Sequence, residues 1–362
     1  MNRPSWACVD LDALRKNYEA AQRMHGERVL AVLKANAYGH GAVRCAQALE
    51  DIADGFAVAF LSEALELRAA GITSPILLLE GVFDEAELKA AAWHSLWVVV
   101  HQETQLRMIE NAPDKVNAMT VWLKMDSGMG RAGFAPHDMA SSFTRLKAAK
   151  AVGDIVLISH FACADEPEKP ATAYQIRTFN LACKGIDAPR SLANSAGILA
   201  WPDAHQSWGR AGIMLYGAHP LPAGQQHAKL RPVMTLRSTV FAERVLEPGT
   251  PLGYGGSFVS ERRTRVGLVA VGYADGYPRT APSGTAVAVD GQRTCLIGRV
   301  SMDMLTVDLT DLPDARVGSQ VELWGPNVDI NLVAAAAGTI AYELLCNVKR
   351  VPLVYSAPVA SV

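Results

Sequence analysis

The first 230 residues alternate short apolar runs with amphipathic stretches, and this alternation most constrains the fold. Continuous apolar runs are typical of strands buried on both faces, as in parallel sheets. Eight such strands with helices between them predict a (β/α)8 barrel, with an open doubly wound sheet as the alternative. The runs are Val29–Leu33, Phe56–Phe60, Ile76–Leu79, Leu96–Val100, Met119–Met125, Ile155–Ser159, Ser191–Ala193 and Gly212–Leu215.

Three stretches between these runs have helical patterns. The stretch from Ser62 to Gly71 begins at a residue type that caps helix N-termini and ends at a glycine, as many helices do. The segments Asp84–Ala92 and Pro136–Lys150 also predict helices.

From about residue 231 the chain changes to short alternating runs rich in Val, Thr, Gly and Arg. Asp290-Gly291 lies between two runs and predicts a tight hairpin. Only Leu332–Leu345 has a helical pattern. We therefore expect two domains, a barrel over residues 1–230 and a mainly antiparallel β domain over residues 231–362. The runs are 234–242, 264–271, 285–289, 293–297, 304–309 and 320–323.

Composition excludes several classes of protein. The chain has 34 Lys and Arg against 36 Asp and Glu, a net charge of −2 that offers no basic excess for nucleic acid or for a membrane surface. The charged N-terminus does not predict a signal peptide, and no apolar run approaches the roughly 20 residues of a membrane helix. The six scattered cysteines predict free thiols, without disulfides or a metal site. We expect a cytoplasmic protein.

Lys34 ends the first predicted strand, in the segment RVLAVLKANAYGHG. Catalytic groups of barrels lie at the carboxyl ends of strands, and partial desolvation there favours a neutral amine. Such an amine can form a Schiff base with an aldehyde cofactor. The alternative is a lysine that extends from a strand end to solvent.

Two further strands end in polar side chains. In WLKMDSGMGRAG, Lys124 and Asp126 lie on one side of a strand and Arg131 follows a glycine loop. These residues predict either a polar cluster in the barrel mouth or a salt-bridged strand end. In ISHFACADE, His160 has the chemistry to stack on a ring or to act as an acid or base, although histidines at strand ends are often structural.

The seventh and eighth predicted strands lie beside the segments ANSAG and WGRAGIMLYG. In barrels, the last two loops of this kind often bind a phosphate through backbone N–H groups and hydroxyls. Ser195 and the backbone of Gly212 and Ile213 suit that role. Arg210 is a permanent donor that can serve a ring nitrogen.

The β half contains Tyr254 between glycines in GYGG. A tyrosine that projects from such a turn can take part in proton transfer, or it can simply fill the turn.

Seven segments in this order resemble the alanine racemase family over nearly the whole chain. The resemblance implies a barrel followed by a β domain, pyridoxal 5'-phosphate as cofactor, and racemisation of alanine by two bases, one on each face of the substrate Cα. The segments are AVLKANAYGHG, WLKMDSGMGRAG, SHFACADE, ANSAG, GRAGIMLYG, VGYADGYPR and GRVSMDM.

The resemblance also implies roles for individual residues. Lys34 would hold the cofactor and act as one base, and Tyr254 would be the base on the opposite face. Arg210 would donate to the pyridine nitrogen, and His160 would stack against the ring. Arg131 would orient the tyrosine and the substrate carboxylate. The cofactor phosphate would be bound by Tyr38, Ser195, Gly212 and Ile213.

Other implied features concern a modification, a second subunit and an access route. Lys124 matches a lysine that is often carbamylated in this family, and Met302 and Asp303 match substrate-site residues. In the family these two residues and the tyrosine base come from the neighbouring subunit, so a homodimer with shared sites is implied. The substrate access corridor would contain Asp165, Tyr273, Arg279 and Arg299.

Two positions depart from the family pattern. Lys349 or Arg350 stands where many relatives have a tyrosine that contacts the phosphate, and Ser191 replaces a histidine found in some relatives.

Four other functions are alternatives: a racemase for serine or lysine, a decarboxylase of this fold, a barrel that only carries the cofactor, and a sugar- or phosphate-binding barrel. Arg210 argues against the decarboxylase, which usually has an acid at the pyridine nitrogen. The racemase itself fits two roles, supply of D-alanine for a bacterial wall and its degradation as a carbon source.

Overall fold

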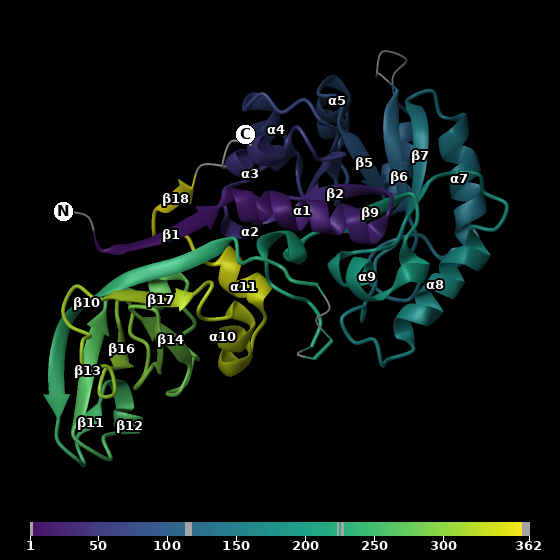
Figure 1. Ribbon diagram of the computed structural model, residues 1–362. Helices are drawn as coiled ribbons and strands as arrows, with labels where there is room; N and C mark the ends of the chain where they lie inside the picture. Colours follow the sequence, from purple (N-terminus) through teal and green to yellow (C-terminus); the bar gives the residue numbers. More distant parts are fainter. Residues whose placement is uncertain (1–2, 113–117, 223, 226–227, 357–362) are drawn as a thin grey trace.

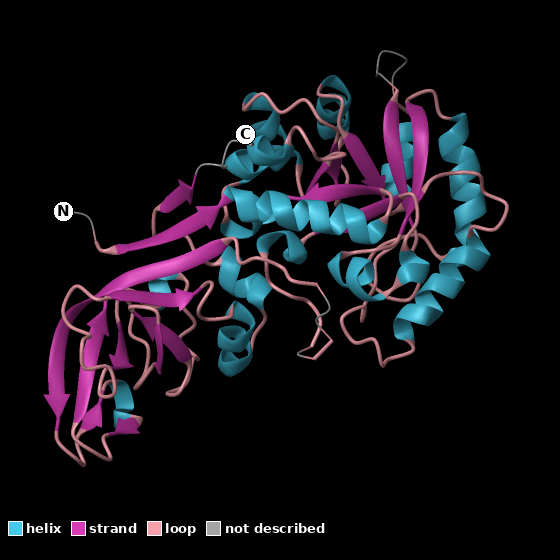
Figure 2. Ribbon diagram, in the orientation of Figure 1, coloured by secondary structure: helices cyan, strands magenta, loops and turns pink. Residues whose placement is uncertain are grey.

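The N-terminal part of the chain folds into a closed barrel of eight parallel strands (Figures 1 and 2). The computed structural model describes residues 3–112, 118–222, 224–225 and 228–356. The barrel strands are β2 (Arg28–Val32), β3 (Phe56–Val58), β4 (Ile76–Leu78), β5 (Trp97–Val100), β6 (Met119–Lys124), β7 (Val152–Ile158), β8 (Arg190–Ser191) and β9 (Trp208–Ala211).

Parallel pairing runs round the barrel and closes between β2 and β9, where Arg28 is in register with Trp208. The closed sheet confirms the barrel and excludes the open doubly wound sheet. The eighth strand is β9, and the prediction of a strand at Gly212–Leu215 was wrong because that apolar run lies beyond the strand, where it forms a 3-10 turn. Burial explains the error, since the strand residues are all buried although they include an arginine.

Helices cover the outside of the barrel, and several begin at capping side chains. Asp84 accepts the amide of Glu87 at 2.8 Å and starts the helix predicted there. The other two predicted helices are present with shifted starts at Leu61 and Met139. The barrel helices are α1 (Leu11–His25), α2 (Lys34–Gly39), α3 (Ala42–Leu49), α4 (Leu61–Ala69), α5 (Glu85–Trp93), α6 (Glu103–Glu110), α7 (Met139–Ala148), α8 (Ala171–Ala182) and α9 (Ser195–Ala200), with 3-10 turns η1 (Pro136–Asp138), η2 (Pro202–Ala204) and η3 (Ile213–Tyr216).

The C-terminal part is mainly antiparallel, as predicted. Its elements are β10 (Met234–Leu246), β11 (Pro251–Leu252), η4 (Tyr254–Gly256), β12 (Phe258–Val259), β13 (Thr264–Val269), η5 (Tyr273–Asp275), β14 (Ala286–Val289), β15 (Gln292–Cys295), β16 (Leu305–Asp308), β17 (Gln320–Trp324), α10 (Ile330–Ala337), α11 (Ala341–Cys346) and β18 (Leu353–Ser356).

The long strand β10 organises this domain, because it pairs with β1 (Ser5–Asp10), β13 and β17. The predicted hairpin is present: Val289 pairs with Gln292, and both Asp290 and Gly291 have positive φ angles. The single helix predicted at Leu332–Leu345 is instead two helices, because Gly338 adopts the left-handed conformation and ends α10.

The two ends of the described chain meet in this second sheet. β1 pairs antiparallel with β10 and parallel with β18, so the N-terminal strand belongs to the sheet of the C-terminal domain (Figure 1). The division at residue 230 stays a proposal, and its outer limits at residues 1–2 and 357–362 lie outside the described residues. Among the described helices, none has the length and apolar character needed to cross a membrane.

Candidate functional site

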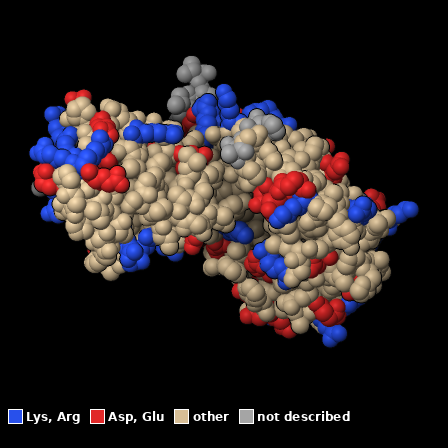
Figure 3. All heavy atoms as spheres, turned by 90° about the horizontal axis from the view of Figure 1, so that it is seen from below, with Lys and Arg blue, Asp and Glu red and all other residues tan. Residues whose placement is uncertain are grey.

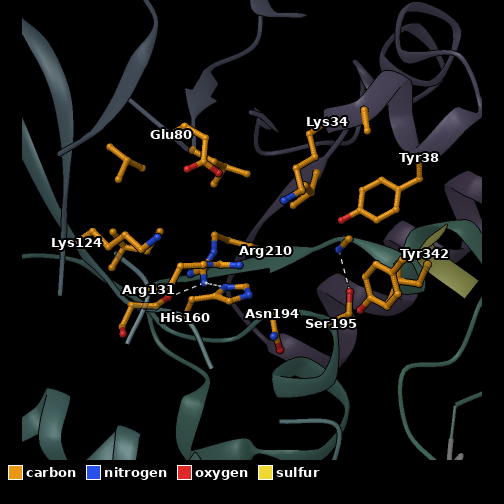
Figure 4. A pocket seen from close by; sticks show the side chains of 18 of the residues that line it. Lys34, Tyr38, Glu80, Lys124, Arg131, His160, Asn194, Ser195, Arg210 and Tyr342 are labelled. Carbon is orange, nitrogen blue, oxygen red and sulfur yellow. Dashed lines mark hydrogen bonds between the residues drawn. The ribbon is translucent and has the colours of Figure 1, made fainter. Parts of the chain in front are cut away.

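A cavity of about 290 Å³ opens at the carboxyl ends of the barrel strands (Figure 4). Lys124 and Arg131 lie at one end, and Ser195 lies at the other. The structure brings together every barrel residue to which the resemblance gave a cofactor role, with Arg131 and Lys124 beside them. These residues are Lys34, Tyr38, Lys124, Arg131, His160, Ser195, Arg210, Gly212 and Ile213.

Lys34 enters the cavity directly after β2, at the start of an unusual backbone turn. Residues Ala35–Tyr38 all have φ between 51° and 55°, so α2 is a left-handed turn. A left-handed helix costs roughly 1–2 kcal/mol for each L-residue, so contacts outside the turn must stabilise it. Glu63 supplies one of them, since its carboxylate accepts the amide of Ala35 at 2.6 Å.

His40 stabilises the same turn from beneath. It is fully buried, and its Nδ1 lies 3.0 Å from the carbonyl of Ala37 and 2.9 Å from that of Tyr38. Since carbonyls only accept, Nδ1 must carry the hydrogen. Burial lowers the pKa of His40 to about 4, so the ring is neutral near pH 7.

The C-terminal domain contributes two side chains to the cavity, Tyr342 and Cys346 of α11. A Cβ added to Gly39 would lie 2.2 Å from the carbonyl oxygen of Leu345, so only glycine allows α11 to pack this closely on the left-handed turn. The ring of Tyr342 comes within 6.0 Å of the ring of Tyr38. Neither residue was predicted from the sequence, in which Gly39 alone indicates that another segment packs closely on this turn.

Arg210 lies in β9 and is only 4% exposed. Its guanidinium donates to the hydroxyl of Ser191 at 2.6 Å and to the carbonyl of Ser159 at 2.7 Å. Burial lowers its pKa to about 10, which leaves it charged near pH 7. The side chain that departs from the family pattern, Ser191, thus anchors this arginine.

His160 accepts a hydrogen bond from this arginine. Arg210 Nη2 lies 3.3 Å from His160 Nδ1, as the dashed line in Figure 4 marks. Burial, with the charge of Arg210 next, holds the pKa of His160 well below its usual range. The imidazole is therefore neutral, and its Nδ1 carries a lone pair.

Ser195, Gly212 and Tyr38 form the opposite end of the cavity. Ser195 Oγ accepts the amides of Gly212 at 2.9 Å and of Met214 at 3.4 Å, which leaves its hydroxyl hydrogen available to a ligand oxygen. A Cβ on Gly212 would lie 2.7 Å from the Tyr38 hydroxyl. A glycine is therefore required for this hydroxyl to approach the backbone.

Lys124 lies among other cations at the far end of the cavity. Burial, followed by Arg131, Arg210 and Lys34, lowers the pKa of Lys124, and the carboxylate of Glu80 opposes the shift. Glu80 also lines the cavity, and the sequence analysis missed it because it follows an apolar strand as a single acidic residue.

Asp126 is not one of the side chains that line this cavity, so the structure does not place it in the expected polar cluster. Its Oδ1 instead accepts the amides of Gly128, Met129 and Gly130 at 2.9–3.1 Å. Burial raises its pKa, but the three N–H groups reverse the effect and the net shift is downward. Asp126 therefore shapes the loop that carries Arg131.

The three predicted site residues of the β domain lie outside the cavity. Tyr254 is 67% exposed, Met302 is 53% exposed, and Asp303 is also exposed; none of them lines the barrel pocket. In Figure 3, a broad area of the β domain carries neither basic nor acidic side chains. Within one chain, the predicted site residues of the barrel are therefore separate from those of the β domain.

Three turns of the β domain lie beside one another and hold these residues. Tyr273 and Ala274 donate backbone hydrogen bonds to the carbonyls of Ser301 and Met302 at 3.0 and 3.1 Å. A Cβ built on Gly255, next to Tyr254, would lie 3.6 Å from a guanidinium nitrogen of Arg299.

The four predicted corridor residues are divided between the two domains. Tyr273 and Arg279 line a second cavity together with Lys349, and Arg299 lies beside the turn of Tyr254. Asp165, on the barrel, is close enough to Tyr342 to raise its pKa, although burial is the larger cause.

Neither candidate for the missing tyrosine position lines the barrel cavity. Lys349 lines the cavity of the β domain, and Arg350 forms a 3.3 Å ion pair with Asp303.

Models of two protein families match the chain. The alanine racemase N-terminal domain matches residues 9–220, and the alanine racemase C-terminal domain matches residues 233–355.

Relatives match along the whole length. An alanine racemase of Azoarcus sp. is 63% identical over 353 residues, which is 98% of this chain and 99% of the relative. A catabolic alanine racemase of Pseudomonas putida is 57% identical, with 98% and 99% covered. The crystal structure of the biosynthetic alanine racemase from Pseudomonas aeruginosa superposes with a TM-score of 0.94 at 48% identity, covering 98% of this chain and 100% of that one.

Proposed function

The chain belongs to the alanine racemase family and is an isomerase that interconverts L- and D-alanine, and we propose that it does so with two bases from two subunits, Lys34 and Tyr254, and with pyridoxal 5'-phosphate in the barrel cavity. The single observation that carries the proposal is the separation of these residues. Lys34 lies in a cavity at the barrel mouth, and Tyr254 projects from an exposed turn of the other domain.

The side chains of the cavity fit this cofactor. Arg210 is a buried cation aimed at neutral acceptors, so it has donors to offer a pyridine nitrogen but no proton to give up near pH 7. Ser195, Gly212, Ile213 and Tyr38 are proposed to bind the phosphate, because the glycine leaves the room that a side chain would fill. When bound, the cofactor supplies an electron sink for the bond between Cα and its hydrogen.

Two bases explain the chemistry of racemisation. A proton must leave one face of the substrate Cα and another must arrive on the opposite face, so one base on each face suffices. Lys34 Nζ is proposed to serve one face and the Tyr254 hydroxyl of the neighbouring subunit the other. Arg131 is proposed to orient that tyrosine and to bind the substrate carboxylate, which it suits as a cation.

A homodimer follows from this arrangement. Met302 and Asp303 are proposed to reach the substrate of the neighbouring subunit together with Tyr254. The exposure of Tyr254 and Met302 supports the proposal, since large side chains exposed together often mark an interface. The corridor to the site would combine Tyr273, Arg279 and Arg299 of one subunit with Asp165 of the other.

Lys124 is proposed to carry a carbamate. The adduct forms when the neutral amine adds carbon dioxide and releases a proton, and a lowered pKa increases the neutral fraction. The carbamate would give Arg131 an anionic neighbour. We also place the enzyme in the cytoplasm, where its six free cysteines would stay reduced.

Two measurements test the activity and the cofactor. The absorbance spectrum of the purified protein is expected to contain the visible band of lysine-bound pyridoxal phosphate. Incubation with L-alanine is expected to give equal amounts of the two enantiomers. A panel with serine and lysine decides between alanine and the alternative substrates, and no conversion of alanine would contradict the proposal.

Mixing of two inactive variants tests the shared site. Lys34→Ala and Tyr254→Phe subunits are each expected to be inactive alone. After dissociation and random reassociation, half of the dimers are mixed, and each mixed dimer has one intact site of two, so about one quarter of the wild-type activity should return. No recovery would show that both bases come from one chain. A mixture of Lys34→Ala with itself is the matched control.

A further inference from the structure

Asp303 is held by Arg350, the neighbour of Lys349 in the segment where many relatives have a tyrosine. Arg350 Nη1 donates to Asp303 Oδ1 at 3.3 Å. Both side chains are about half exposed, so this ion pair adds little to the free energy of unfolding. The ion pair is instead expected to fix the direction of the Asp303 carboxylate, because an exposed side chain without such a contact samples several rotamers.

Arg350 is itself anchored by a buried carboxylate. Its Nε lies 3.8 Å from Asp275 Oδ1, and the Asp275 side chain has 0% exposure. Arg3, from the N-terminal segment before β1, makes a second and shorter ion pair with the same oxygen at 2.7 Å. A buried carboxylate needs such cations, and two of them converge here from opposite ends of the chain.

Asp275 also ties this cluster to the loop that carries Met302. Its Oδ2 accepts the amide of Gly272 at 2.9 Å. A Cβ on Gly272 would lie 2.2 Å from the carbonyl oxygen of Met302, so the two loops are in direct backbone contact. Tyr273 and Ala274 complete the contact with their two hydrogen bonds to the 301–302 backbone.

We propose that Arg350 is a positioning residue for racemisation: anchored on buried Asp275, it holds Asp303 and the Ser301–Met304 loop in the geometry that the neighbouring subunit's site requires. The inference rests on the proposed function, which gives Asp303 and Met302 to the substrate site. Arg350 acts through Asp303 and does not touch substrate. The cluster of Arg3, Asp275, Arg350 and Asp303 thereby connects the N-terminal segment to the active site.

The test compares Arg350→Gln with Asp303→Asn, with the double variant, and with Arg262→Gln as the control. Arg262 forms an exposed ion pair with Asp311 in the same domain, and neither residue belongs to these loops. Arg350→Gln is expected to raise KM for L-alanine about tenfold, with kcat changed less than about twofold. The thermal midpoint should match that of the control, because Arg3 still neutralises Asp275. Arg350→Lys should have a KM between that of the wild type and that of Arg350→Gln.

The double variant shows whether Arg350 acts through Asp303. Its KM should equal that of Asp303→Asn alone, whereas independent roles would multiply the two effects. Amide hydrogen exchange over residues 301–304 should also be faster in Arg350→Gln than in the control, a readout that does not depend on activity.

The outcomes separate the inference from its premise. If Asp303→Asn leaves KM unchanged, the assignment of Asp303 to the substrate site fails, and the inference fails with it. If Asp303→Asn raises KM but Arg350→Gln does not, the site assignment stands and only the positioning role is overturned. Multiplicative effects in the double variant would overturn it as well.

Discussion

The cavity of the barrel and the exposed turns of the β domain are built in opposite ways. The cavity is closed round by strand ends, a left-handed turn and a buried arginine, and its polar groups are oriented by neighbours in the same chain. The turn of Tyr254 projects from the surface, and its side chain does not line the barrel cavity. The difference is the one expected under the proposal that the barrel holds a cofactor and that the β domain completes the site of another subunit.

Lys34→Ala should cause the largest loss, because it removes both the covalent attachment and one base. Racemisation is expected to fall at least about 10⁴-fold, and the visible band of lysine-bound cofactor should disappear. The control is Lys89→Ala, whose amine lies 3.9 Å from Glu85 on an exposed helix face. A persistent band would move the attachment to another lysine of the cavity, Lys124.

Tyr254→Phe should remove the proposed base of the β domain without affecting the barrel cavity. The visible band should persist, and racemisation should fall about 10²–10⁴-fold in both directions, since one general base is lost. Tyr174→Phe, which changes another exposed tyrosine, on α8, should keep full activity. Near-normal turnover in Tyr254→Phe would refute the two-base assignment.

Lowering the pH should destabilise the barrel before it destabilises the β domain. All nine histidines precede residue 231, and burial lowers the pKa of both His25 and His40 to about 4. The unfolded chain therefore binds more protons below about pH 6.5, and the free energy of unfolding falls as pH drops from about 6.5 toward 4, by up to about 3 kcal/mol for each histidine.

Hydrogen exchange at pH 7 and pH 5 locates the loss. Barrel amides should lose protection first, and β10 and β13 should lose little. Equal loss in both domains would contradict the assignment to histidines. His137, which is exposed, provides a control through His137→Gln, which should leave the pH profile unchanged.

Gly39→Ala should have the smallest effect of the four changes, and it should act on the contact between the barrel and the β domain. The new Cβ would meet the Leu345 carbonyl, so α11 must shift, and the free energy of unfolding should fall by about 2 kcal/mol. Gly26 has nearly the same φ angle but open space around it, so Gly26→Ala should cost about 1 kcal/mol from backbone strain alone. Denaturant unfolding measures both, and equal losses would show that the close contact is unimportant.

The sequence predicted most of the barrel because its strands follow a simple physical pattern. Buried parallel strands are continuous apolar runs, and seven of the eight predicted runs overlap an observed barrel strand, the seventh at Ser191 alone. The eighth was displaced because β9 contains Arg210, a charged side chain that belongs in a buried strand only for its contacts at the cavity. The charge of Arg210 therefore interrupted the apolar pattern by which β9 would have been predicted.

The site residues that were missed depend on long-range packing. Tyr342 and Cys346 reach the cavity only because α11 packs on the turn after Lys34, a contact between segments about 300 residues apart that no local pattern indicates. Asp126 was misplaced for a related reason: strand alternation gives the face of a side chain, but whether a carboxylate enters a cavity or caps a loop depends on the nearest free N–H groups.

The pairing of β1 with both β10 and β18 sets the order in which the chain can finish folding. Ala7 in β1 pairs with Leu353 in β18, which is synthesised about 350 residues later. At about 5–20 residues per second, β1 waits roughly 20–70 seconds for that partner strand. During this time its edge is open to wrong partners, including the same strand on a neighbouring nascent chain. The late strand β18 thus completes the protection of the early strand β1.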